Sequence, residues 1–273
     1  GCSSLIELNL INFSTNKLRN MKGLFSECSS LISIDISSFD VSRVTNMNSI
    51  FSDCRKLNSL NLDYLKTINV VDMNSMFKGC SSLISISFSN FDTSKVINMA
   101  KLFSDCNSLT TLDISNFNVS SVKIMAYMFS GCKLLNSLKL PDFSSLSVQN
   151  ISHMFSDCST LNSLDLSNFD SSSVTTMDYM FSGCRFLVSL KINNFNTSNV
   201  YDMKFMFADC SSLKEINLDS FDTRNVKYMN GMFYGCESLE SLKISHFDTT
   251  LTENMSFMFY HLKLVEYLLL SNF

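Results

Sequence analysis

The sequence predicts an α/β solenoid, a right-handed coil with one parallel β-strand and one short helix in every turn. Three observations lead to this fold class. All ten cysteines are spaced 26 residues apart, ten phenylalanines keep the same spacing, and no insertion or deletion interrupts the period. A fixed period of roughly 20–50 residues is typical of solenoids, in which each repeat contacts only its neighbours. We therefore expect a single solenoid domain over residues 1–273, with about ten and a half repeats.

The strand of each repeat should follow the cysteine. After Cys158, apolar residues occupy the third, sixth, eighth and eleventh positions: Leu161, Leu164, Leu166 and Phe169. The alternation around the sixth and eighth positions indicates a short strand whose two apolar side chains point inward. We expect strands centred on Ile34–Ile36, Leu164–Leu166 and the equivalent residues, all parallel and about 4.8 Å apart.

A turn and a short helix should complete each repeat. Asp, Ser and Thr residues follow the second phenylalanine, and their side chains fix turns by bonding to nearby backbone amides. Asn46 and its equivalents then precede an apolar i, i+3, i+4, i+7 pattern, which predicts capped helices over Met47–Cys54, Met177–Cys184 and the equivalent residues. Crossovers between parallel strands should be right-handed. These helices should lie opposite the strands, on the convex side of a leucine-rich repeat solenoid.

The repeat motif itself resembles that of a known family. Met154–Ser172 and its copies follow M-F-x-x-C-x-x-L-x-x-L-x-L-x-x-F-D-x-S, which is similar to the repeat of the BspA-like leucine-rich repeat surface proteins of bacteria and protists. The resemblance covers the whole chain. It implies a cell-surface or extracellular location and an adhesive or antigenic role, and it implies no catalytic residue.

The cysteines form one ladder, because each occupies the same position of its repeat: Cys2, Cys28, Cys54, Cys80, Cys106, Cys132, Cys158, Cys184, Cys210 and Cys236. We interpret them as buried free thiols, since an unpaired cysteine behaves as a small apolar residue. Disulfides between adjacent repeats are the alternative, although separate stacked helices would hold the cysteines too far apart. A metal site is disfavoured because no Cys-x-x-Cys pair or nearby histidine completes one.

Catalytic, cofactor and metal sites are not expected. The methionine that recurs with the period fills a core position, as methionine often does between irregular elements. The three histidines, His153, His246 and His261, fall at three different positions of the repeat, and no catalytic constellation recurs near them.

The residue before each cysteine alternates between Asp and Gly, as in Asp53, Gly79, Asp105 and Gly131. This rhythm is consistent with duplication of a 52-residue unit, and it keeps like charges from stacking on one another. A calcium ladder is the functional alternative, but the glycines interrupt it.

Two surfaces are candidates for contacts. One is a row of mainly aromatic residues: Tyr127, His153, Tyr179, Phe205 and Phe257. An exposed row of this kind marks a contact surface, whereas packing of each ring on the next repeat is the alternative. The other is the outward face of the strands, which is rich in serine and carries one weak cluster of charges, Lys191, Glu215 and Lys243.

Five sequons would permit N-glycosylation, if the chain follows a eukaryotic secretory route: Asn12, Asn118, Asn150, Asn196 and Asn254. Asn118 and Asn196 lie in the turn after the second phenylalanine, where a glycan would fit. Asn150 and Asn254 lie at expected N-caps, which a glycan would disturb.

The charge and hydropathy of the chain disfavour two classes of partner. The net charge is −4 with no basic stripe, which disfavours nucleic acid, and no apolar run is long enough for membrane insertion. We expect a non-enzymatic structural or adhesive surface protein that associates with itself end to end or through its convex side, as an uncapped part of a longer chain or fibre. The alternative is a discrete recognition module that binds a host or matrix protein or glycan on its concave face.

Overall fold

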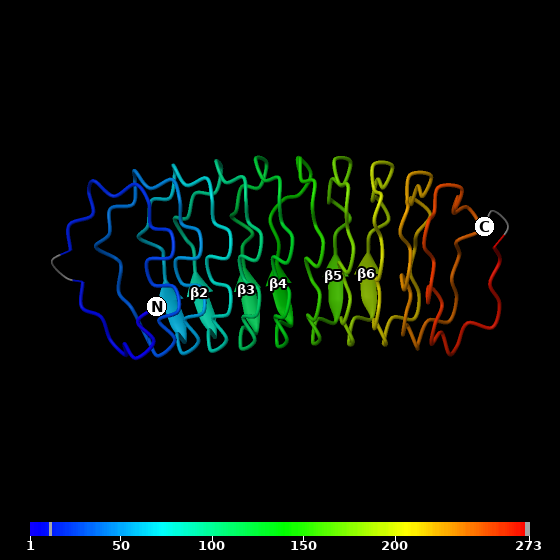
Figure 1. Ribbon diagram of the computed structural model, residues 1–273, viewed down its shortest axis with the longest axis horizontal. Coiled ribbons are helices and arrows are strands. Elements are labelled where there is room, and N and C mark those ends of the chain that lie inside the picture. Colours follow the sequence, from blue (N-terminus) through cyan, green and yellow to red (C-terminus); the bar gives the residue numbers. More distant parts are fainter. Residues whose placement is uncertain (11–12, 271–273) are drawn as a thin grey trace. The chain divides into compact units, whose positions relative to one another are not determined.

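The chain folds into two compact units of stacked repeats, Gly1–Asp142 and Phe143–Phe273. The computed structural model describes residues 1–10 and 13–270. The first unit contains strands β1 to β4 and the second contains β5 and β6 (Figure 1). Their bounds are Ser59–Asn61, Ser85–Ser87, Thr111–Asp113, Ser137–Lys139, Ser163–Asp165 and Ser189–Lys191.

The strands pair in parallel, and the register equals the repeat. β1 pairs with β2, β3 with β4, and β5 with β6, and the central pair of the last is Leu164 with Leu190. The parallel solenoid predicted from the period is thereby confirmed within each unit. Strand β5 begins one residue before the predicted centre, and Leu164 and Leu166 are both buried as expected. Ile34–Ile36 forms no strand, although Ile36 is buried.

The predicted helices are wrong. Among residues 1–10 and 13–270 no helix is formed, and Met47–Cys54 and Met177–Cys184 are runs of tight turns. The backbone φ is +56° at Ser49 and +59° at Asp53. A right-handed helix requires negative φ at every residue, so two left-handed residues four positions apart exclude it.

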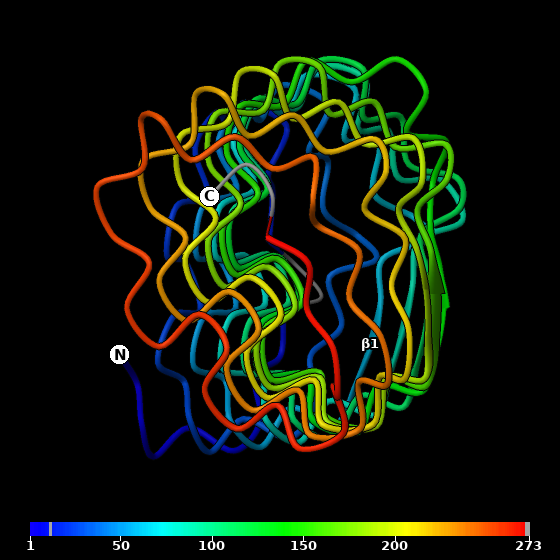
Figure 2. The same ribbon diagram turned by 90° about the vertical axis from the view of Figure 1, so that its right-hand side faces the viewer.

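Two alternating sets of hydrogen bonds replace the helix. The amides of Met47, Ser49, Phe51 and Asp53 donate to carbonyls 25 residues later, in the next repeat, over 2.6–2.9 Å. Of the intervening amides, those of Ile50, Ser52 and Cys54 close turns on the carbonyl three residues earlier, and that of Asn48 donates to the side-chain oxygen of Asn46. Every amide of the segment is therefore satisfied, half of them by the neighbouring repeat. Figure 2 looks along the stack, and successive repeats follow one another closely within each unit.

The core of each unit is a set of stacked rows. Neighbouring rings of the first phenylalanine row are nearly parallel, with centroids 5.9 Å apart for Phe51 and Phe77 and 5.8 Å for Phe155 and Phe181. Offset stacking at this distance adds to the burial of apolar area. The second row is also buried at Phe169. These contacts join each repeat to the next within a unit, so the stack is held together by side-chain packing between repeats although each repeat consists mostly of short turns.

A buried row of hydroxyls lies beside the second phenylalanine row. The Thr197 hydroxyl donates to the carbonyl oxygen of Asp222 over 2.8 Å and accepts the amide of the same residue over 2.7 Å. Thr67 and Ser171 make the same double contact with the next repeat. Each hydroxyl thus satisfies two backbone groups that would otherwise be partly buried without partners.

The alternation of Asp and Gly before the cysteines has a steric cause. A Cβ atom at Gly79 would lie 2.6 Å from Oδ1 of Asp53, and one at Gly131 would lie 2.5 Å from Oδ1 of Asp105. Each aspartate therefore occupies the space that a side chain of the next repeat would need. The glycines also have positive φ, which glycine adopts without strain.

Candidate functional site

The cysteine ladder lies inside the repeats. Nine cysteines are buried and Cys2 is exposed. The thiol of Cys54 donates to the carbonyl of Phe25 over 3.0 Å, and burial raises the pKa of the Cys132 and Cys184 thiols to about 12. The segments that carry the cysteines pair directly rather than as separate helices, so the spacing argument against disulfides no longer holds. The free thiol state stays a prediction that rests on burial.

The aromatic row packs along the stack in the second unit. His153 and Tyr179 stack with ring centroids 4.5 Å apart, and Tyr179 and Phe205 follow at 5.0 Å. The Phe205 ring covers Gly231, where a Cβ atom would overlap it. Phe257 is 64% exposed. In the first unit, Lys101 lies over the ring of Tyr127 at 5.2 Å, a cation–π contact.

The sequons are placed as follows. Asn12 lies outside the described residues. Asn118 and Asn196 are exposed, and the side-chain oxygen of each accepts the amide and the hydroxyl of the serine two residues later. Asn150 and Asn254 accept the amide two residues later. Those two residues are thus caps of tight turns, and not of helices as predicted.

His153 belongs to a half-buried cluster of polar groups that sequence reasoning missed. Its Nε2 lies 3.7 Å from Oδ2 of Asp178, and the other carboxylate oxygen, Oδ1, accepts hydrogen bonds from the hydroxyls of Ser152 and Thr176. Burial opposes the Asp178 charge, but the two hydroxyls and Lys204 outweigh it and lower its pKa. The Ser152 hydroxyl donates to Asp178 and so belongs to the same cluster.

The strand face of the second unit contains a hollow of about 550 Å³. Lys191, Glu215 and Lys243 line it, so the structure brings together the three charged residues of the weak cluster. Glu215 interrupts a row that is serine at Ser163, Ser189 and Ser241. We call this cavity the strand-face hollow. It is polar, open to solvent and built from three successive repeats.

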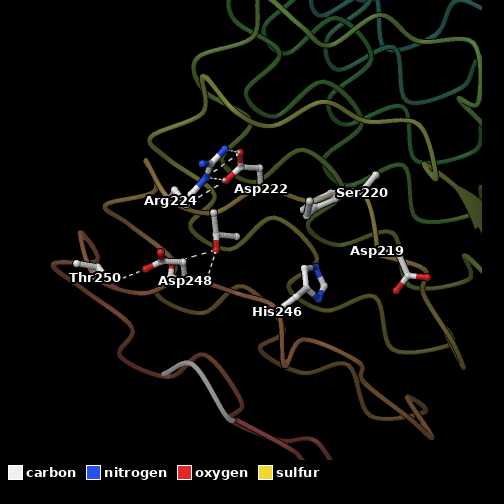
Figure 3. A pocket seen from close by; sticks show the side chains of 9 residues that line it. Asp219, Ser220, Asp222, Arg224, His246, Asp248 and Thr250 are labelled. Carbon is white, nitrogen blue, oxygen red and sulfur yellow. Dashed lines mark hydrogen bonds and ion pairs between the residues drawn. The ribbon is translucent and has the colours of Figure 1, made fainter.

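A second hollow of about 640 Å³ adjoins it at Asp219, which lines both (Figure 3). Here Arg224 makes a bidentate contact with Asp222, in which Nε donates to Oδ1 over 3.0 Å and Nη2 to Oδ2 over 2.6 Å, and this hydrogen bonding lowers the pKa of Asp222. His246 Nε2 lies 3.1 Å from the carbonyl oxygen of Leu218. At the same position of an earlier repeat, the Asn116 amide donates to the equivalent carbonyl, that of Phe88, over 2.8 Å, so His246 has a structural role here.

The structure was also searched for metal sites and for membrane-spanning helices. Within the described part of the chain, no group of three or more His, Cys, Asp or Glu residues is arranged to hold a metal ion. No helix in residues 1–10 and 13–270 has the length and apolar character needed to cross a membrane. The Asp and Gly residues before the cysteines pack on one another.

Comparison with solved structures finds bacterial leucine-rich repeat proteins, the group that the repeat motif resembles. A protein from Eubacterium ventriosum is 18% identical, with 90% of this chain and 74% of that chain covered and a TM-score of 0.49. A leucine rich cell surface protein from Faecalibacterium prausnitzii is 20% identical, with 88% and 66% covered and a TM-score of 0.47. A T. pallidum leucine-rich repeat protein is 21% identical, with 71% of each chain covered and a TM-score of 0.38. The chain therefore spans about two thirds of the F. prausnitzii protein.

No curated protein matches the chain. One family model matches residues 2–87, 61–164, 83–187 and 149–272, so its overlapping copies follow the repeats through almost the whole sequence. The chain belongs to the family described as "Mycoplasma protein of unknown function, DUF285".

Proposed function

We propose that the protein is a non-enzymatic recognition and adhesion module that acts at the cell surface or outside the cell. It binds a host or matrix glycan or protein through the strand face of its second unit. The observation that carries this proposal is the strand-face hollow, where Lys191, Glu215 and Lys243 interrupt an otherwise serine-rich surface. Glu215 departs from a row that is serine at Ser163, Ser189 and Ser241.

The composition of the hollow supports recognition over catalysis. Its charged residues come from three successive repeats. A charged surface of this kind suits binding, since repeat proteins use extended sheet surfaces for partners. The surface location is the property of the F. prausnitzii relative that we extend to this chain. A right-handed coil, as expected for parallel crossovers, is part of the proposal.

Binding to host cells and matrix-coated surfaces tests the proposal. We expect the purified chain to bind, and the double variant Lys191→Glu with Lys243→Glu to lose most of this binding. Lys66→Glu combined with Lys56→Glu is the matched control, because these exposed residues lie in the first unit and give the same change in net charge. Equal binding by both double variants and the unaltered chain would refute recognition by this face.

Self-association is a second candidate, favoured by two exposed aromatic residues. Phe257 and Tyr260 are 64% and 47% exposed and pack edge to face on each other. An apolar patch of this kind drives association of identical chains when concentrations are high. Sedimentation velocity over a range of concentrations tests it: Phe257→Ser with Tyr260→Ser should remove any concentration-dependent species. Assembly into a fibre would require such contacts to propagate.

A further inference from the structure

The charged row on the strand face follows a rule in two places. Asp113 of β3 pairs with Lys139 of β4, and Asp165 of β5 pairs with Lys191 of β6, each with a Nζ–Oδ2 distance of 2.9 Å. In both cases an aspartate of one repeat neutralises the lysine at the same position of the next. Hydrogen bonds from a serine and from the lysine lower the pKa of each aspartate to about 2.

The rule breaks at the next pair along the chain. Lys243 again occupies the lysine position, but the preceding residue in the row is Asn217. The amide oxygen of Asn217 accepts the backbone N–H of Asp219 over 2.9 Å. Within the described residues, Lys243 makes no ion pair. The strand-face hollow therefore contains a cation whose counter-ion, present twice elsewhere in the row, is missing.

The remaining lining of the hollow restricts what can supply that counter-ion. Ser189, Ser241 and Asn193 offer hydroxyl and amide groups that both donate and accept hydrogen bonds. Glu215 accepts hydrogen bonds and repels a second negative charge. Val188, which is 45% exposed, gives a small apolar surface at the edge. A ligand that fits has one carboxylate, several hydroxyls and a small apolar face.

We propose that the strand-face hollow binds the acidic sugar unit of a glycan, a pyranose with a single carboxylate. The carboxylate takes the place of the missing aspartate and pairs with Lys243. The sugar hydroxyls donate to Glu215 and exchange hydrogen bonds with Ser241 and Asn193, and the C–H face of the ring packs on Val188. The inference rests on the proposed function and specifies its ligand. Hexuronates and sialic acids share this chemistry.

Saturation-transfer difference NMR on the whole chain tests the inference with three probes: methyl glucuronide, the methyl glycoside of N-acetylneuraminate, and neutral methyl glucoside. We expect a signal for at least one acidic probe and none for the neutral one. The preferred acidic probe tells whether the natural source is a uronate or a sialic acid. Equal signals for neutral and acidic sugars, or no signal for either acidic sugar, would overturn the inference.

Two variants make the test specific. Lys243→Gln removes the cation and should weaken acidic sugar binding about 10-fold, the loss of one charge-assisted contact. Asn217→Asp should have the same effect because it restores the internal counter-ion, and the row tolerates aspartate at Asp113 and Asp165. Thermal unfolding confirms that both variants remain folded. Lys66→Gln, in the first unit, is the matched control and should bind as the unaltered chain does.

The outcomes separate the inference from the proposed function. If Asn217→Asp and Lys243→Gln bind acidic sugars normally, the ligand is not held by this cation and the inference is wrong. If cell binding depends on Lys191 and Lys243 while no acidic sugar binds, the inference fails and the proposed function stands. If cell binding is independent of both lysines, the proposed function fails as well.

Discussion

Replacement of Gly131 by alanine tests whether steric contact with Asp105 requires glycine at this position. Gly131 has a φ of +75°, and a Cβ atom there would lie 2.5 Å from Oδ1 of Asp105. A left-handed alanine costs about 1–2 kcal/mol. Displacing the aspartate from its rotamer adds about 0.5–1.5 kcal/mol. Alanine also restricts the unfolded chain, which offsets about 0.4–1 kcal/mol.

The net expectation for Gly131→Ala is a loss of about 1–2.5 kcal/mol in the free energy of unfolding. Gly23→Ala is the matched control. Gly23 has a φ of +63°, but the nearest atom to its Cβ would be 3.8 Å away, so only the backbone terms apply. It should lose at least about 0.5 kcal/mol less than Gly131→Ala.

Urea unfolding followed by circular dichroism measures both variants. A double-mutant cycle with Asp105→Ala isolates the contact, since removal of the aspartate should recover the steric part of the loss. Equal destabilisation by Gly131→Ala and Gly23→Ala, or no recovery in the double variant, would refute steric pairing as the cause of the alternation.

Three further predictions concern the rest of the stack. Thr197→Val should lower the free energy of unfolding by about 1–3 kcal/mol, because the amide and the carbonyl of Asp222 both lose their hydroxyl partner. Thermal unfolding measures the loss, and a value below about 0.5 kcal/mol would contradict the role of the buried hydroxyl row. Asp113 and Asp165 have folded pKa values of about 2, below the ordinary 3.8, so their contribution to stability is present above about pH 4 and disappears as the pH falls toward 2. Replacing both by asparagine should flatten the stability profile over that range, and an unchanged profile would contradict it. Burial raises the pKa of Cys132 to about 12, so iodoacetamide should label Cys2 in the native chain and the other cysteines only after denaturation, as mass spectrometry would detect; mass spectrometry that finds linked neighbouring cysteines would contradict free thiols.

The period determined much of the fold from the sequence. Residues such as Leu164, Leu166 and Phe169 recur with the repeat, so parallel stacking with these side chains inward followed directly. The conformation of the segment before each cysteine did not follow from the sequence. Apolar residues at i, i+3, i+4 and i+7 face inward in a helix, but they also face inward in successive tight turns closed by left-handed residues. The sequence did contain a signal. Gly79 lies in the last turn of a predicted helix, where glycine is unfavourable, and its alternation with Asp53 indicated a backbone with positive φ.

The candidate site was predictable only in part. Lys191, Glu215 and Lys243 stood out as charged residues among serines, and the register of the stack then brings them together. Arg224 and His246 do not recur with the period, so no row in the sequence marked them and the adjoining hollow was not anticipated. The polar cluster around Asp178 was missed for another reason: Asp178 and its partners Ser152 and Lys204 occupy the same position of three successive repeats, and the residue type there differs each time.

The pairing of aspartate with glycine makes two repeats, and not one, the unit by which such a chain can change length. Deleting the repeat that contains Gly79 would bring Asp53 against Asp105, where two carboxylates would compete for one space. Deleting two consecutive repeats would leave every aspartate over a glycine. Gain and loss of length by recombination should therefore proceed in steps of 52 residues, and shuffled designs that respect this parity should fold more readily than those that break it.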